Sequence, residues 1–182
     1  MLRLFVGLSL PQGVRDHLAT LTGGIPGARW VQADAYHITL FFAGEVPEPV
    51  AADLDEQLVR LTAPGFDLSI RGVGHFGTRR KPSSLWAGVD RAPPLAFLRN
   101  KVERAAVAAG FEPEDRKFAP HITLARLRQA PMARVQTWLA HHDALRLPPI
   151  PVTAFTLFRS HLGSERARYE ALADYPLAPP AG

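Results

Sequence analysis

Two four-residue segments of this 182-residue chain are identical, and each contains a histidine and a threonine two positions apart. Residues 37–40 and residues 121–124 both read His-Ile-Thr-Leu. Successive side chains of a strand alternate between its two faces, so the histidine and the threonine project together. Ile38, Leu40 and, by the same alternation, Phe42 are expected to project into a core. Each segment therefore predicts a strand that presents one imidazole and one hydroxyl, in a register fixed by apolar residues.

A pair of imidazoles is well suited to phosphoryl transfer. In-line attack places the entering and leaving oxygens on opposite sides of phosphorus, so the reaction needs a base on one side and an acid on the other. The ordinary histidine pKa of about 6.5 allows one neutral and one protonated ring near neutral pH. Thr39 and Thr123 can donate hydrogen bonds to the non-bridging oxygens. No cluster of Asp or Glu accompanies the histidines, so we expect a reaction without a metal or other cofactor.

The composition indicates a soluble chain with an anionic partner. Hydrophobic residues make up 47% of the sequence, which is enough for one domain with its own core. The absence of cysteine excludes disulfides and thiolate metal sites and favours the cytoplasm. No apolar run approaches the roughly 20 residues of a transmembrane helix. The net charge of +4, carried mostly by arginine, is typical of proteins that bind phosphate or nucleic acid, although solvated surface charge gives the same balance.

The hydrophobic pattern predicts alternating strands and helices. Prolines are typical of the first turn of a helix and glycines of the residues that follow its end. On this basis we expect helices to begin at residues 11, 50, 93 and 131. Strands are expected over residues 2–10, 28–43, 66–70, 85–89, 118–127, 152–158 and 168–173.

The order of these elements repeats. His121 lies 84 residues after His37, and a shift of 84 residues maps strands onto strands and helices onto helices. The basic loop at residues 77–84, which contains Arg79 and Arg80, falls on a second basic loop at residues 161–168. We therefore expect a single domain over residues 1–182, made of two pseudo-symmetric lobes. The two His-x-Thr strands would face each other across a central cleft, with a basic loop from each lobe beside it.

Further residues near the motifs could contact a substrate. Arg79 and Arg80 are candidates to attract phosphate, although such loops are often only solvated. Phe5, Phe41 and Phe42 are alternative candidates to stack on a nucleobase, as aromatic side chains commonly do in RNA-binding proteins.

The paired His-x-Thr motifs resemble those of the 2H phosphoesterase superfamily, and most of all its RNA 2',3'-cyclic phosphodiesterases, long called 2'-5' RNA ligases. Residues 3–11, 37–45 and 120–126 carry the likeness. The resemblance implies a bilobal α+β fold with two antiparallel sheets around the cleft and helices outside. It also implies metal-independent catalysis by His37, Thr39, His121 and Thr123, and contact of Arg126 with the phosphate or nucleotide. Simple alternation turns Arg126 away from the cleft unless the strand twists or bulges.

We accordingly expect hydrolysis of 2',3'-cyclic phosphate ends of RNA or nucleotides to 2'-phosphomonoesters, with 2'-5' ligation as the reverse reaction. By the same resemblance His121 is the base and His37 the acid. The expected protein is a cytoplasmic monomer. One alternative is a related phosphodiesterase that acts on another cyclic or 2'-5' linked nucleotide. The other is an RNA-binding module without catalysis, which would not need a matched acid and base.

Overall fold

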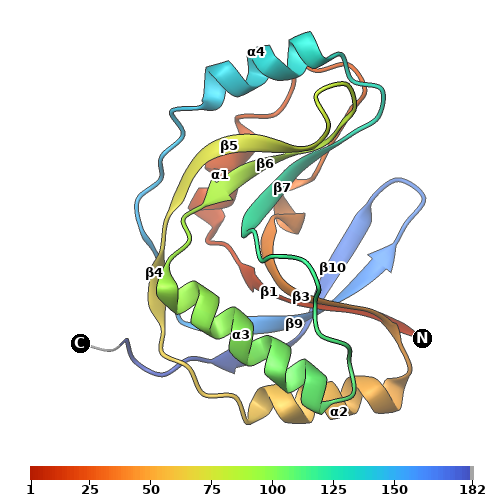
Figure 1. Ribbon diagram of the computed structural model, residues 1–182, viewed down its shortest axis with the longest axis vertical. Coiled ribbons are helices and arrows are strands. Elements are labelled where there is room, and N and C mark those ends of the chain that lie inside the picture. The colour runs from red at the N-terminus through yellow and green to blue at the C-terminus, as the bar shows by residue number, and fades with distance from the viewer. Residues whose placement is uncertain (181–182) are drawn as a thin grey trace.

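The computed structural model describes residues 1–180, whose strands form two four-stranded sheets and one two-stranded sheet (Figure 1). The first sheet has the order β10-β9-β1-β3 and contains β1 (Leu2–Ser9), β3 (His37–Val46), β9 (Ala154–Leu162) and β10 (Ala167–Pro176). The second has the order β2-β7-β6-β5 and contains β2 (Ala28–Trp30), β5 (Ile70–Gly77), β6 (Pro82–Val89) and β7 (His121–Leu127). The short strands β4 (Phe66–Leu68) and β8 (Ile150–Val152) pair with each other.

The two His-x-Thr strands meet where the sheets adjoin. β3 is the last strand of the first sheet, and it lies against β7 of the second. Ile38 and Ile122, which follow the two histidines, are both fully buried in the shared core. The paired strands of both sheets are antiparallel. The prediction of an α+β fold with antiparallel sheets is therefore confirmed.

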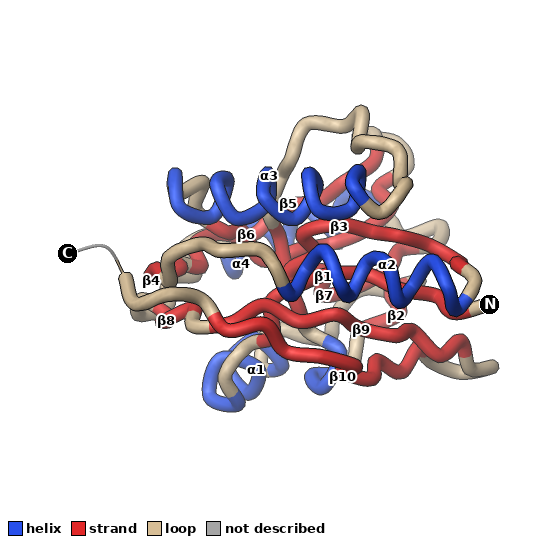
Figure 2. Tube along the Cα trace, turned by 90° about the horizontal axis from the view of Figure 1, so that it is seen from below, coloured by secondary structure: helices blue, strands red, loops and turns tan. Residues whose placement is uncertain are grey.

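Within residues 1–180, four α-helices cover these sheets, and each begins beside a proline as the sequence predicts. They are α1 (Gln12–Ala19), α2 (Glu48–Val59), α3 (Pro93–Ala108) and α4 (Met132–His142). α3 follows β6 of the second sheet but packs against β3 of the first and against α2. α4 packs against β5, and its Trp138 donates a 2.8 Å hydrogen bond to the Leu21 carbonyl just after α1. Figure 2 shows α3 on one side of the sheets and α1 on the opposite side.

The segment before the first motif differs from the prediction of one strand over residues 28–43. Residues 28–30 form the separate strand β2, and a 3-10 turn, η1 (Ala33–Ala35), intervenes before β3 begins at His37. β2 pairs with β7 of the second sheet, whereas β3 belongs to the first. A local pattern does not reveal that the chain changes sheets within six residues, because the change depends on long-range pairing.

The predicted strand at residues 66–70 is also divided. β4 ends at Leu68, and β5 begins at Ile70 with a register shift before Val73. Gly72 occupies this shift with φ of 72°, a conformation that favours glycine. The bend expected from the glycines is present.

Each His-x-Thr strand contains a β-bulge directly after its threonine. In β3, Thr39 and Phe41 pair with successive residues of β1, so Leu40 between them has no partner there. In β7, Thr123 and Ala125 pair with successive residues of β6, and Leu124 is passed over in the same way. An extra residue reverses the alternation of all side chains beyond it. The expected core position of Phe42 is therefore wrong: Phe41 is buried, and Phe42 is 46% exposed.

Candidate active site

The ring of His37 is oriented by two hydrogen bonds at the start of β3. Its Nδ1 lies 2.8 Å from the carbonyl oxygen of Ala35, and its Nε2 lies 2.9 Å from Oγ1 of Thr39. Because a carbonyl only accepts, Nδ1 carries the proton of the neutral ring. Nε2 then accepts from the Thr39 hydroxyl. In β3 the motif thus holds Nε2 of the histidine and the threonine hydroxyl within hydrogen-bond distance of each other.

His121 is held in the same way at the start of β7. Its Nδ1 lies 2.7 Å from the carbonyl oxygen of Ala119, two residues earlier. This bond fixes the tautomer whose Nε2 is free to take or give a proton. Within residues 1–180, Nε2 of His121 has no protein hydrogen-bond partner. Sequence reasoning missed both orienting carbonyls, since any residue supplies one and only the backbone path reveals it.

Aromatic side chains from distant strands surround both rings. His37 lies 4.6 Å from Phe5 and 5.0 Å from Tyr169, measured between ring centroids, with Tyr169 edge-on. Phe76 contacts His121 edge-on at 4.8 Å. Tyr169 and Phe76 were not among the predicted site residues. They lie in β10 and β5, respectively, and the strand pattern of the sequence does not show which side chain reaches a histidine.

Burial, together with nearby positive charge, lowers the pKa of His37. Burial among the aromatic rings is the largest cause, and the Ala35 carbonyl partly opposes it. Positive charge on His121 and Arg126 lowers the pKa of His37 further. These two side chains, both from β7, therefore act on the histidine of β3. The structure brings both motifs into one electrostatic site whose charge attracts an anion.

Arg126 shares this site because of the bulge in β7. The extra residue returns Arg126 to the face of His121 and Thr123, although it lies five positions after the histidine. Phe42 has the matching position in β3, five residues after His37. The Arg3 guanidinium carbon lies 5.0 Å from the centroid of the Phe42 ring. One strand thus offers a cation at this place, and the other an aromatic ring.

The remaining predicted residues lie in different surroundings. Phe5 is only 3% exposed, and its ring stacks on Phe158 at 4.9 Å besides contacting His37. Stacking of Phe5 on a nucleobase stays a prediction, although its ring is already packed against Phe158 and His37. Arg79 and Arg80 are exposed in the turn between β5 and β6, at the tip of a hairpin. Their contact with phosphate stays a prediction.

Within residues 1–180, no group of three or more His, Asp or Glu side chains is arranged to hold a metal ion. Over the same residues, no helix has the length and apolar character needed to cross a membrane.

Comparisons with known proteins assign the family. Residues 14–164, which include both motifs, match the 2'-5' RNA ligase superfamily. The RNA 2',3'-cyclic phosphodiesterase of Escherichia coli is 33% identical over 96% of each chain. That of Geobacillus stearothermophilus is 33% identical over 95% of this chain, which spans only 56% of that relative's length. The crystal structure of E. coli LigT complexed with 3'-AMP superposes with a TM-score of 0.74 and 31% identity, over 97% of this chain and 98% of LigT. This chain belongs to the 2'-5' RNA ligase superfamily.

Proposed function

We propose that this protein hydrolyses 2',3'-cyclic phosphate ends of RNA or nucleotides to 2'-phosphomonoesters. The observation that carries the proposal is the convergence of two similarly oriented imidazoles and Arg126 on one site. The names of the E. coli and G. stearothermophilus relatives support this substrate class. The LigT structure complexed with 3'-AMP supports a site of nucleotide size.

In the proposed reaction, His121 removes a proton from water as the water oxygen attacks phosphorus. The P–O3' bond breaks on the opposite side, and His37 gives a proton to O3'. The phosphate stays on O2', so the product is a 2'-phosphomonoester. Once His37 is protonated, its Nε2 no longer accepts from the Thr39 hydroxyl, so Thr39 and Thr123 can both donate hydrogen bonds to the non-bridging oxygens, where negative charge increases. When a 5'-hydroxyl attacks phosphorus in place of water, the same steps form a 2'-5' phosphodiester and free O3', which is 2'-5' ligation.

The lowered pKa of His37 constrains this division of roles. In the free protein His37 loses its proton more readily than an ordinary histidine, which suits a base better than an acid. A bound phosphate acts in the opposite sense, because its negative charge favours the protonated ring. His37 therefore becomes an effective acid only when substrate is bound.

We also propose that the reaction needs no metal or other cofactor and that the protein acts as a monomer in the cytoplasm. Neither imidazole needs a metal to transfer a proton, and the arginine supplies positive charge. We further propose that residues 1–182 form one bilobal domain that arose from a repeat of about 84 residues. In support, β4 and β8 pair with each other and lie 84 residues apart.

The proposal is tested by incubating the pure protein with several 2',3'-cyclic nucleotides and a 2'-5' linked dinucleotide in excess EDTA. Phosphorus NMR identifies the product. We expect cyclic substrates to give only 2'-monoesters, at a rate that EDTA leaves unchanged. A 3'-monoester would contradict the assigned direction of cleavage, and dependence on an added divalent ion would contradict the metal-free mechanism. Cleavage of the 2'-5' linkage alone would favour the alternative phosphodiesterase, and binding without turnover would favour an RNA-binding module.

A further inference from the structure

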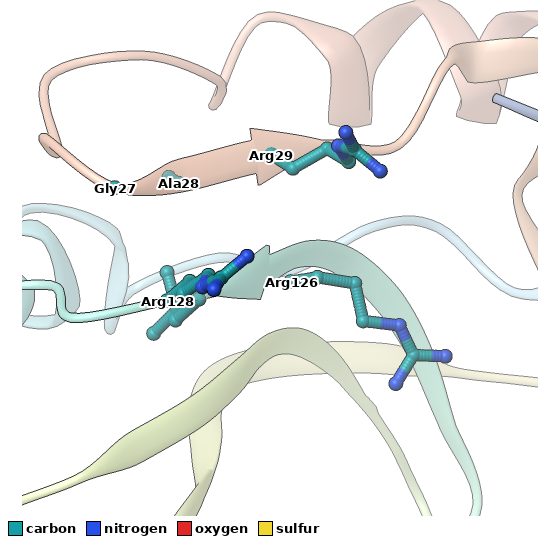
Figure 3. Close-up of a pocket in the computed structure, with 6 residues that line it drawn as sticks. Gly27, Ala28, Arg29, Arg126 and Arg128 are labelled. Atoms are coloured by element: carbon teal, nitrogen blue, oxygen red, sulfur yellow. The ribbon is translucent and has the colours of Figure 1, made fainter. Parts of the chain in front are cut away.

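A hollow of ≈ 340 Å³ lies beside the candidate active site, where β2 crosses from the first lobe to pair with β7 (Figure 3). Its walls are Gly27, Ala28 and Arg29 on one strand and Arg126, Leu127 and Arg128 on the other. Arg126 belongs to the site described above. Arg29 and Arg128 extend its positive charge beyond the histidines.

The arginines of the hollow are placed unfavourably unless an anion binds there. Arg29 lies directly opposite Arg126 in the antiparallel register, so the two side chains share one face of the sheet. Like charges directly opposite each other destabilise a sheet. Within residues 1–180, neither of these arginines nor Arg128 forms an ion pair with a carboxylate. Among residues 1–180, the arginines that do have acidic partners are Arg60 with Glu56, Arg71 with Asp90, and Arg99 with Glu103.

The backbone holds this arrangement in place. The Arg128 amide donates a 3.0 Å hydrogen bond to the Gly27 carbonyl. A Cβ at Gly27 would lie 2.4 Å from the Arg128 carbonyl oxygen, and Gly27 has φ of 80°, so only glycine allows this close approach. Arg29 and Arg126 thus lie on paired strands, and Arg128 directly after β7 is held by its backbone hydrogen bond to Gly27.

The spacing of the arginines matches an extended anionic strand. Arg126 and Arg128 are two residues apart, about 6.7 Å along a strand, which is comparable to the separation of successive phosphates in a nucleic acid. Figure 3 shows the Arg126 side chain extending along β7, away from Arg128. Positive charge therefore extends from the histidines to Arg126 and Arg29, which lie side by side on paired strands, and then to Arg128, two residues after Arg126.

We infer that this hollow binds the upstream phosphates of an RNA strand whose cyclic end lies between His37 and His121. The inference rests on the proposed function and specifies its substrate as an oligoribonucleotide. A cyclic phosphate occupies both O2' and O3' of the last nucleotide, so the rest of the RNA is attached only through the 5' oxygen of that nucleotide. The next phosphate then lies one nucleotide from the histidines, in the direction of Arg29 and Arg128.

The test compares a 2',3'-cyclic mononucleotide with a trinucleotide that has the same cyclic end, at low salt. We expect the wild-type protein to have a higher kcat/KM for the trinucleotide. The double variant Arg29→Ala/Arg128→Ala should lower the ratio of the two kcat/KM values at least tenfold. It should also make the slope of log(kcat/KM) against log[salt] for the trinucleotide shallower, by about 0.7 per lost phosphate contact.

Arg104→Ala, an exposed arginine on α3, is the matched control for loss of charge and should leave the ratio unchanged. Arg29→Gln/Arg128→Gln keeps the side-chain length and serves if the alanine variant does not fold. A wild-type ratio near one, or a ratio that neither double variant changes, would overturn the inference while the proposed function stands. If the wild-type protein cleaves neither substrate, the proposed function itself fails.

Discussion

The two half-sites, His37 with Thr39 in β3 and His121 with Thr123 in β7, have the same backbone arrangement but different surroundings. In each, a histidine at the start of a strand donates from Nδ1 to the carbonyl two residues earlier. In each, a bulge follows the threonine and returns the fifth residue after the histidine to the same face. The motif therefore fixes where the reactive nitrogen and the hydroxyl lie.

The difference lies in what surrounds each ring. His37 is enclosed by Phe5 and Tyr169, and its Nε2 is bonded to Thr39, whereas His121 has Phe76 on one side. At the fifth position one strand has Phe42 and the other Arg126. Burial lowers the pKa of His37 most, and positive charge on His121 and Arg126 lowers it further. In the proposed reaction, the asymmetry between the two histidines would thus depend on residues outside the two His-Ile-Thr-Leu segments.

The largest expected effect is the loss of either imidazole. His37→Gln or His121→Gln should each lower kcat by about 10²- to 10⁴-fold, the range typical of general acid–base catalysis. Single-turnover rates on a cyclic nucleotide measure the loss, and circular dichroism checks the fold. A variant that keeps wild-type kcat would show that only one half-site takes part in the chemistry.

Loss of a threonine hydroxyl should have the next largest effect. Thr39→Val and Thr123→Val should each lower kcat by about 10²- to 10³-fold if both hydroxyls stabilise charge in the transition state. Equal losses would mean that the hydroxyls act alike in spite of the Thr39 bond to His37. If the loss appears only in KM, the hydroxyls bind the ground state and the proposed role is wrong.

The two half-sites differ in charge at the fifth residue after the histidine, which is Phe42 in β3 and Arg126 in β7. Arg126→Ala should lower kcat/KM by about 10- to 100-fold, since hydrogen bonds to charged groups contribute about 1.5–3 kcal/mol. Phe42→Ala should have a smaller effect, because Arg3 already lies over its ring. Steady-state kinetics on one cyclic nucleotide gives both values. A larger loss for the phenylalanine variant would show that base stacking outweighs phosphate contact.

The smallest expected effect is a change in the pKa of His37. Proton NMR should place the pKa of His37 below the ordinary value of about 6.5, so that the ring is protonated only at lower pH. Arg126→Ala should raise this pKa because it removes a positive neighbour, and inorganic phosphate should raise it by adding negative charge. A pKa above the ordinary value in the free protein would contradict the electrostatic account.

Much of this arrangement could be predicted from the sequence, because it depends on local patterns. Two copies of His-Ile-Thr-Leu indicate two half-sites, and proline and glycine mark the helices. Periodicity alone did not place the bulges, although the resemblance required a twist or bulge in β7 for Arg126; their positions turn Arg126 to the face of His121 and Phe42 out of the core. The same holds for the crossing of β2 to the second sheet, which brings Arg29 opposite Arg126. These features depend on pairing between residues distant in sequence, so periodicity within a segment does not contain them.

The most direct test of divided roles uses a cyclic substrate whose O3' is replaced by sulfur, a leaving group that needs little protonation. If His37 is the acid and His121 the base, His37→Ala should recover much of its lost rate on this substrate, and His121→Ala should not. Rescue of the His121 variant instead would reverse the two roles. Rescue of neither would contradict the central claim, since both histidines would then mainly bind the phosphate.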